Sequence, residues 1–453
     1  MENKKMIDIL STLYQKPLYT LIDIGFLADT DYFDEILKNK DNYNFEFSKV
    51  YNKEYYEIIL DTNFEVKRMM RPLIQNVKLD SGIDIEEIED MDEMDDTTQV
   101  SNEYLIQDEN YIYEISPISD EMVALIIETI VNSENKYYIR NLREFLFFRN
   151  YNQKEKVKNT KISDLILYNF KREFMTLKIK ASQKTKYSQF NELKNSYLFN
   201  FMLLNNVELT TKSTRYNRLF QESKRRIVNN QQTIKTVLPE YIYDSNLITY
   251  YKKAITANDV FSEYLSYYHI IEYYFDRLYN DNVVKQMQNW LKDVTILGDD
   301  ESLLKFADKV KKIKGKSSED GQGNEQEAFA LVLKKYVDVD KLTYKLTELS
   351  DKVIKSEFKF SIRESNMLDY YITNSVNFIG KDFKIDFNND NTAIKNIRNR
   401  IYQTRNSLVH SKDSYKFKTY HPYDDEKYLI KEIPLIKLIA EEIIINSSNP
   451  IYD

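Results

Sequence analysis

The spacing of the apolar residues changes along this chain, and this change constrains the fold more than any other feature. Three early segments, residues 19–27, 55–60 and 111–115, carry the β-branched and aromatic residues that favour strands. From Ser119 onward the apolar residues recur at helical spacing. The first residues with this spacing are Met122, Leu125, Ile126, Ile130 and Val131. The sequence therefore predicts an α+β protein whose strands lie in a mixed first half.

Pro239 marks the expected domain boundary, because proline and the residue before it resist helix. A chain of 453 residues is long enough for two or three domains. We expect a sensing or regulatory region of mixed α and β structure over residues 1–240 and an all-helical domain over residues 241–453. The charged segment near residues 305–335 contains glycine and serine, and it is predicted to be a flexible loop inserted into the helical domain.

A long aromatic helix is predicted over residues 258–279, where apolar residues recur at intervals of three and four. Glu272 is a charge set among these apolar positions. We expect it either to pair with Arg398 or Arg405 or to lie at a solvated edge of the helix. Further helices are predicted over residues 137–149, 162–178, 188–205, 326–336, 340–357 and 366–378.

Gaps in the composition exclude whole classes of function. The chain has no cysteine, which excludes disulfides, thiolate zinc sites, iron–sulfur clusters and cysteine nucleophiles. It has three histidines, too few for a histidine-rich metal site, and seven glycines. The nearest approach to a phosphate-binding loop, residues 315–317, has Val310 where that motif requires glycine. We therefore expect no cofactor and no metal ion, and a magnesium site made of carboxylates alone stays open.

The net charge of −8 argues against binding of polyanions through the bulk charge of the chain. For the acidic residues 84–96 we favour a mobile surface loop over a nucleic-acid mimic or an autoinhibitory tether. For the basic residues 212–226 we favour a solvated helix face over contacts with RNA phosphates. No apolar run reaches eighteen residues and the N-terminus is unlike a signal peptide, so we expect a cytoplasmic protein without membrane contact.

Residues 391–412 form the most informative segment. At about 100° per residue, four of its apolar residues fall within roughly a 60° arc, so they would face a helical core. These residues are Ile394, Ile397, Ile401 and Leu408. Arg405, Asn406 and His410 share a basic, hydrogen-bonding strip on another side of the same helix. Asn406 and His410 are four residues apart and are therefore neighbours on one face.

These three side chains supply what RNA cleavage without a metal ion requires. A histidine can take the 2′-hydroxyl proton or donate one to the leaving oxygen. An arginine can hold the scissile phosphate and stabilise charge in the transition state. An asparagine can orient the histidine or hold a phosphate oxygen. The structural alternative is a helix end at which His410 caps terminal carbonyls and Arg405 forms an ion pair.

The combination resembles the HEPN superfamily (the higher eukaryote and prokaryote nucleotide-binding family) over roughly residues 250–446. Ribonucleases of that family carry an arginine and a histidine separated by four to six residues, often with Asn, Asp or His directly after the arginine. The run from Arg405 to His410 matches this pattern without a gap, and residues 264–275 look like the first helix of Abi-like and ApeA-like HEPN proteins. The chain departs from the toxin–antitoxin branch at Lys412, where that branch has tyrosine.

The resemblance implies an all-α helical bundle that acts as an endoribonuclease, needs no metal ion and leaves a 2′,3′-cyclic phosphate. Its catalytic residues would be Arg405, Asn406 and His410, with Glu272 as an auxiliary residue. HEPN enzymes usually form homodimers, and a two-fold axis would bring a second His410 to the same cleft.

Many HEPN relatives are toxins of abortive infection that cut cellular RNA once a phage is sensed. The resemblance therefore implies an antiviral role, with restraint by the N-terminal region, the acidic segment or an inhibitory partner, and release by a phage-derived trigger. The alternative is a non-catalytic HEPN protein that binds RNA, a nucleotide or a partner through a helical dimer.

The two other histidines are given minor roles. His269 lies within the aromatic helix, and without obvious partners it is predicted to be a core or interface residue. His421 follows the motif helix and is expected in a turn.

Overall fold

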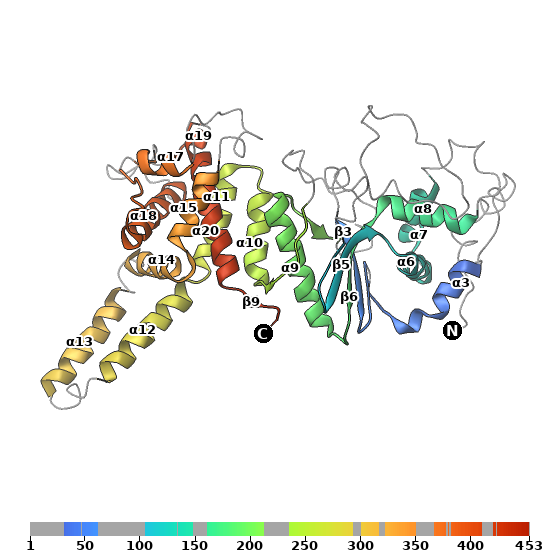
Figure 1. Ribbon diagram of the computed structural model, residues 1–453, viewed down its shortest axis with the longest axis horizontal. Coiled ribbons are helices and arrows are strands. Elements are labelled where there is room, and N and C mark those ends of the chain that lie inside the picture. Colours follow the sequence, from blue (N-terminus) through green and yellow to red (C-terminus); the bar gives the residue numbers. More distant parts are fainter. Residues whose placement is uncertain are drawn as a thin grey trace. The chain divides into compact units, whose positions relative to one another are not determined.

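The computed structural model describes residues 31–46, 48–61, 105–133, 135–147, 161–212, 235–292, 300–316, 322–349, 367–376, 379, 382–409, 420–422 and 424–452. The chain divides into two compact units, Met1–Ile227 with Gln231–Pro239 and Val228–Asn230 with Glu240–Asp453 (Figure 1). The predicted strand at 19–27, the acidic segment 84–96, the basic segment beyond Lys212, and His410 lie outside the described residues.

An antiparallel sheet forms the frame of the first unit, with the strand order β1–β2–β3–β6–β5–β4, and β7 also pairs with β3. The strands are β1 (Asn44–Glu46), β2 (Lys49–Tyr51), β3 (Tyr55–Asp61), β4 (Leu105–Gln107), β5 (Tyr111–Pro117), β6 (Met175–Ala181) and β7 (Thr210–Thr211). Ile179 of β6 pairs with Tyr56 on one side and Tyr113 on the other. The centre of the sheet is therefore assembled from segments that are far apart in the sequence.

Helices cover both faces of this sheet (Figure 1). Ile59 of β3 lies in a core shared with the helices α3 (Asp31–Lys38), α6 (Asp120–Asn132), α7 (Lys136–Phe147) and α8 (Ile162–Glu173). Tyr56 of the same strand stacks on Phe190 of α9 (Tyr187–Asn205), with ring centroids 5.7 Å apart. Because successive side chains of a strand point to opposite faces, β3 serves both layers.

Glu57 places a charge inside this unit. Its side chain is completely buried, and its carboxylate accepts hydrogen bonds from the Ser119 amide and hydroxyl, the Tyr55 hydroxyl and the Thr176 hydroxyl. Ser119 is also the N-cap of α6, because its hydroxyl accepts from the Met122 amide. The carboxylate therefore ties β3 and β6 to the start of α6.

The second unit is helical. Its helices are α10 (Ser245–Ile255), α11 (Val260–Glu272), α12 (Phe275–Leu291), α13 (Asp300–Lys316), α14 (Gln322–Tyr336), α15 (Val339–Glu348), α17 (Met367–Thr373), α18 (Asp390–Val409), α19 (Glu426–Leu429) and α20 (Ile433–Asn446), with a short 3-10 helix, η4 (Ile430–Glu432). The strands β8 (Tyr241–Ile242) and β9 (Asn449–Pro450) pair with each other. α20 packs against α10, α11, α14 and α15 and therefore lies at the centre of the unit.

These elements confirm the predicted α+β class, with the large sheet in the first part and a largely helical second part. The predicted flexible loop near 305–335 is wrong for most of its length, because α13 and α14 occupy residues 300–316 and 322–336, whereas the helix predicted over 326–336 is confirmed as part of α14. Ala328, Phe329, Val332 and Leu333 are buried and share one face of α14, which explains the helix. Within the described part of the chain, none of the helices has the length and apolar character needed to cross a bilayer.

The aromatic segment 258–279 was predicted as one helix, and it is two. Asp259 caps α11 by accepting a hydrogen bond from the Ser262 amide, and α11 ends at Glu272. After a turn at Tyr273 and Tyr274, α12 begins at Phe275. Both turn residues remain close to helical backbone angles, so the apolar spacing continues through the break and conceals it.

Candidate functional site

The motif segment forms α18, as its periodicity predicts. The Asn389 side chain accepts hydrogen bonds from the backbone amides of Asn391 and Thr392, which satisfies free donors at the start of the helix. The predicted apolar stripe is buried, and it comprises Ile394, Ile397, Ile401 and Leu408. α18 packs against α11, α14 and α15. The core contacts of this stripe fix which side of α18 carries Arg405.

Arg405 lies near the C-terminal end of α18 with 21% of its side chain exposed. Its Nη2 is 3.6 Å from Glu272 Oε1 and 3.6 Å from Glu325 Oε1, and its Nη1 donates to Asn406 Oδ1 at 3.1 Å. The guanidinium carbon is 5.2 Å from the centre of the Tyr268 ring, within the range of a cation–π contact. The guanidinium group is therefore held from several sides while part of it still faces solvent.

The predicted pairing of Glu272 with an arginine of this helix is confirmed for Arg405. Arg398, the other arginine considered, donates instead to the Asn399 side chain at 2.8 Å and 3.3 Å. Glu272 is the last residue of α11, whereas Arg405 is close to the end of α18. The pair therefore joins two helices that are remote in the sequence.

Glu325 of α14 also belongs to the group of side chains around Arg405, and the sequence did not predict its place there. Its Oε1 accepts a hydrogen bond from Tyr268 Oη at 3.2 Å, and its Oε2 accepts one from Tyr402 Oη at 3.1 Å. Burial raises the pKa of Tyr268 above its ordinary value, and the charge of Glu325 acts in the same direction. The tyrosines therefore keep their protons and act as donors. Glu325 escaped notice because its segment was assigned to a flexible loop.

His269 extends the cluster on its other side. Its Nδ1 is 3.0 Å from Glu272 Oε2, while Oε1 of the same carboxylate faces Arg405. The hydrogen bond with His269 holds the pKa of Glu272 below its ordinary value, and the charge of Arg405 adds to this effect against an opposing contribution from burial. With 43% of its side chain exposed, His269 is not a core residue, and that part of the prediction is wrong.

The structure brings two of the three predicted catalytic residues together at the end of α18. Arg405 and Asn406 are in direct contact through their side chains, and both are partly exposed. His410 follows Val409 in the sequence and lies outside the described residues. His421 is exposed in an irregular segment, as expected, and its amide donates to Asp425 Oδ2 at 2.9 Å.

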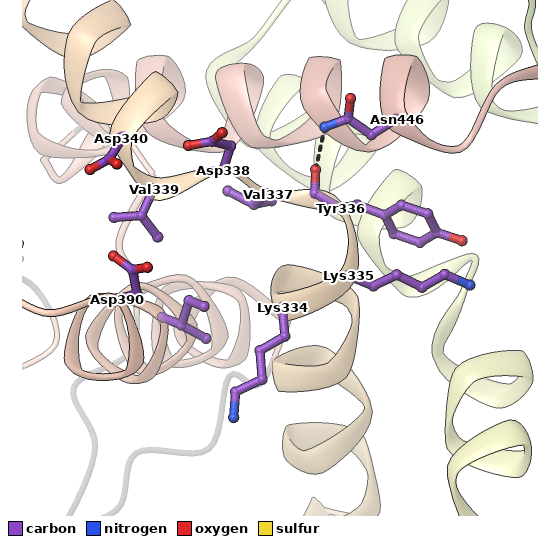
Figure 2. A pocket seen from close by; sticks show the side chains of 10 residues that line it. Lys334, Lys335, Tyr336, Val337, Asp338, Val339, Asp340, Asp390 and Asn446 are labelled. Carbon is purple, nitrogen blue, oxygen red and sulfur yellow. Dashed lines mark hydrogen bonds between the residues drawn. The ribbon is translucent and has the colours of Figure 1, made fainter. Parts of the chain in front are cut away.

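A pocket of about 410 Å³ lies elsewhere in this unit. Figure 2 shows its lining, which comes from the end of α14, the start of α15, the start of α18 and the end of α20. Asp390 lines this pocket, and Arg405 follows it by about four helical turns, or roughly 22 Å along the axis. The pocket is therefore separate from Arg405 and the side chains around it.

The Arg405 cluster comprises Tyr268, His269, Glu272, Glu325, Tyr402, Arg405 and Asn406. It combines a cation that can hold a phosphate, an imidazole that can transfer a proton, and carboxylates that orient both. Among the residues that the structure describes, no group of three or more histidine, aspartate and glutamate side chains has the arrangement of a metal site. The side chains of the cluster offer acid–base and electrostatic chemistry.

Comparisons of this chain with protein-family models, with curated proteins and with solved structures find no match. The HEPN resemblance therefore rests on the residues of the motif and of the aromatic segment.

Proposed function

We propose that the helical unit is an endoribonuclease of the HEPN type that cleaves RNA without a metal ion. The observation that carries this proposal is the state of Arg405. Its guanidinium group is positioned by Tyr268, Glu272 and Glu325, yet the two carboxylates stand at 3.6 Å, beyond ordinary hydrogen-bond distance. A phosphate oxygen would form a shorter, charge-assisted contact with the same group.

The reaction is a transesterification within the RNA. The 2′-oxygen attacks the adjacent phosphorus and loses its proton to a base, while the bond from phosphorus to the 5′-oxygen breaks. That leaving oxygen takes a proton from an acid, and the products are a 2′,3′-cyclic phosphate and a 5′-hydroxyl. Arg405 would stabilise the charge that grows on the phosphate, Asn406 would hold a phosphate oxygen or orient the histidine, and His410 would serve in acid–base catalysis.

The biological setting follows from the same resemblance. A ribonuclease of this kind damages its own cell unless it is restrained, so we place it in abortive infection, released by a phage-derived trigger. The N-terminal unit, the acidic segment or a partner protein would provide the restraint. A homodimer through the helical unit would bring two copies of the motif to one cleft.

Glu272 and Glu325 also favour a second function. A phosphate that approaches Arg405 must compete with two carboxylates, and like charges so close to a ligand weaken its binding. In a non-catalytic HEPN protein the cluster would be structural, and the helical surface would bind RNA, a nucleotide or a protein partner.

Cleavage assays separate these functions. The full chain and its variants Arg405→Ala and His410→Ala are incubated with cellular RNA in EDTA, with and without lysate from phage-infected cells. Arg277→Ala, which removes an exposed arginine of α12, controls for the loss of one positive charge. We expect cleavage by the wild type and the control and none by the two folded motif variants. Equal cleavage by all four proteins would make the motif structural and favour the binding function.

A further inference from the structure

In the Arg405 cluster, the Glu272 carboxylate lies between the His269 imidazole and the Arg405 guanidinium and contacts both. Nδ1 of His269 contacts one oxygen of the Glu272 carboxylate at 3.0 Å, and the other oxygen of that carboxylate faces Nη2 of Arg405 at 3.6 Å. A single carboxyl group thus separates the imidazole from the guanidinium. A phosphate held by Arg405 would therefore lie beside the Glu272 carboxylate, which His269 contacts through its other oxygen.

The surroundings of His269 orient its ring. Glu272 is three residues further along α11, so the two side chains lie on one face of that helix. The Tyr250 ring of α10 packs beside the imidazole, with centroids 5.5 Å apart and planes inclined by 37°. Contacts on the ring edge and the ring face restrict its rotation.

The tautomer follows from the partner of Nδ1. Glu272 stays ionised, since its pKa is held below the ordinary value, and an ionised carboxylate can only accept a hydrogen bond. Nδ1 therefore carries the hydrogen, and Nε2 is the atom that gains or loses a proton. An imidazole oriented by a carboxylate at Nδ1 is the arrangement in which Nε2 acts as a general base and the carboxylate stabilises the imidazolium that forms.

We propose that His269 is a catalytic residue of the same subunit, the general base that takes the 2′-hydroxyl proton. This inference rests on the proposed ribonuclease function. As the bond between the 2′-oxygen and phosphorus forms, the 2′-hydroxyl proton moves to Nε2 of His269. The bond from phosphorus to the 5′-oxygen breaks, and that oxygen takes a proton from the general acid of the proposed ribonuclease.

The test compares His269→Ala with His421→Ala, since His421 is a second exposed histidine that no described contact links to Arg405. Cleavage is measured in EDTA at saturating RNA, with infected-cell lysate present, and binding is measured with a 2′-deoxy oligonucleotide that cannot be cleaved. We expect His269→Ala to lower kcat by about 10²–10⁴-fold with little change in Kd. Added imidazole should restore part of the rate, which a structural role would not explain.

A second measurement does not depend on the variant. The chain has three histidines, so ¹³C-labelled histidine gives three imidazole signals. The 2′-deoxy oligonucleotide should shift the His269 signal of the wild type, and an unchanged signal on binding would overturn the proposal. Full activity of His269→Ala beside an inactive Arg405→Ala would also overturn it and would leave the ribonuclease standing. If the wild type cleaves nothing, or if Arg405→Ala stays fully active, both proposals fall together.

Discussion

Replacement of Arg400 by methionine should destabilise the helical unit strongly, because it leaves a buried carboxylate without its partner. Arg400 is completely buried on α18, five residues before Arg405. Its Nε and Nη2 each donate to the Glu432 carboxylate at 2.7 Å, and its Nη1 donates to the carbonyl oxygens of Asn374 and Phe383 at 2.8 Å and 2.9 Å. Burial opposes the charge, but the facing Glu432 outweighs it, so the pKa of Arg400 lies above its ordinary value.

The magnitude follows from the buried charge that the substitution leaves without a partner. Removing one partner of a buried ion pair costs about 3–5 kcal/mol, since the remaining charge keeps its desolvation penalty. Glu432 is 2% exposed, so water cannot replace the guanidinium without rearrangement. With a urea dependence of about 2 kcal/mol per molar, the loss lowers the unfolding midpoint by roughly 2 M. The double variant Arg400→Met/Glu432→Met should recover most of this loss, because it leaves no charge unpaired.

Trp290 makes the assay specific to this unit. It is the one tryptophan of the chain, and it packs against Phe306 in the helical unit. Its fluorescence is followed through urea unfolding of the full chain, with circular dichroism as a second probe. Arg398→Met is the matched control. Arg398 is partly exposed on the same helix, and its side chain donates hydrogen bonds to the side chain of the neighbouring Asn399. Midpoints of the two variants within about 0.3 M of each other would refute the reasoning.

Two further substitutions test carboxylates in the two units. Glu57→Gln should lower the free energy of unfolding of the first unit by about 1–3 kcal/mol, because an amide cannot accept all the hydrogen bonds that the buried carboxylate accepts. Urea unfolding followed by circular dichroism measures this loss, and Glu54→Gln, at an exposed residue, controls for the change in charge. Glu272→Gln should cost at most about 1 kcal/mol at pH 7, given that its side chain is 36% exposed. Because the pKa of Glu272 is lowered in the folded state, its contribution is present above its ordinary value of 4.5 and is lost as the pH falls through the folded-state value. Unfolding midpoints of wild type and variant should therefore converge as the pH falls below 4.5, and a gap that persists would contradict an ionic origin.

Local patterns allowed several parts of the fold and the site to be predicted. β3 and β5 were found from their β-branched and aromatic residues, and both lie in the interior of the sheet. The apolar stripe of α18 follows directly from helical spacing, and with it the position of Arg405 and Asn406 on another face. A charge among apolar residues needs a partner, so Arg398 and Arg405 could be named as candidates for Glu272, and the structure selects Arg405.

The parts that escaped prediction depend on contacts between remote segments. Residues 162–178 were read as one helix, but α8 ends at Glu173 and β6 begins at Met175. β6 is a strand because it pairs along its length with both β3 and β5, and no local pattern reports that pairing. Glu325 belongs to the cluster through Tyr402, which is 77 residues away in the sequence. Only the packing of α14 against α18 brings them together.

Arg400 and Arg405 lie on the same helix, but they differ in whether a ligand could reach them, and only the structure shows this difference. Both arginines lie on α18 and both face carboxylates. Arg400 is completely buried, and each of its three nitrogens donates at least one hydrogen bond of 2.9 Å or less. Because it is buried, a ligand cannot reach it, and its ion pair joins α18 to Glu432. Arg405 differs from Arg400 because Glu272 and Glu325 lie 3.6 Å from its Nη2, beyond ordinary hydrogen-bond distance, and because part of its side chain reaches solvent. A phosphate could displace these weaker contacts, whereas at Arg400 it would have to break a buried pair.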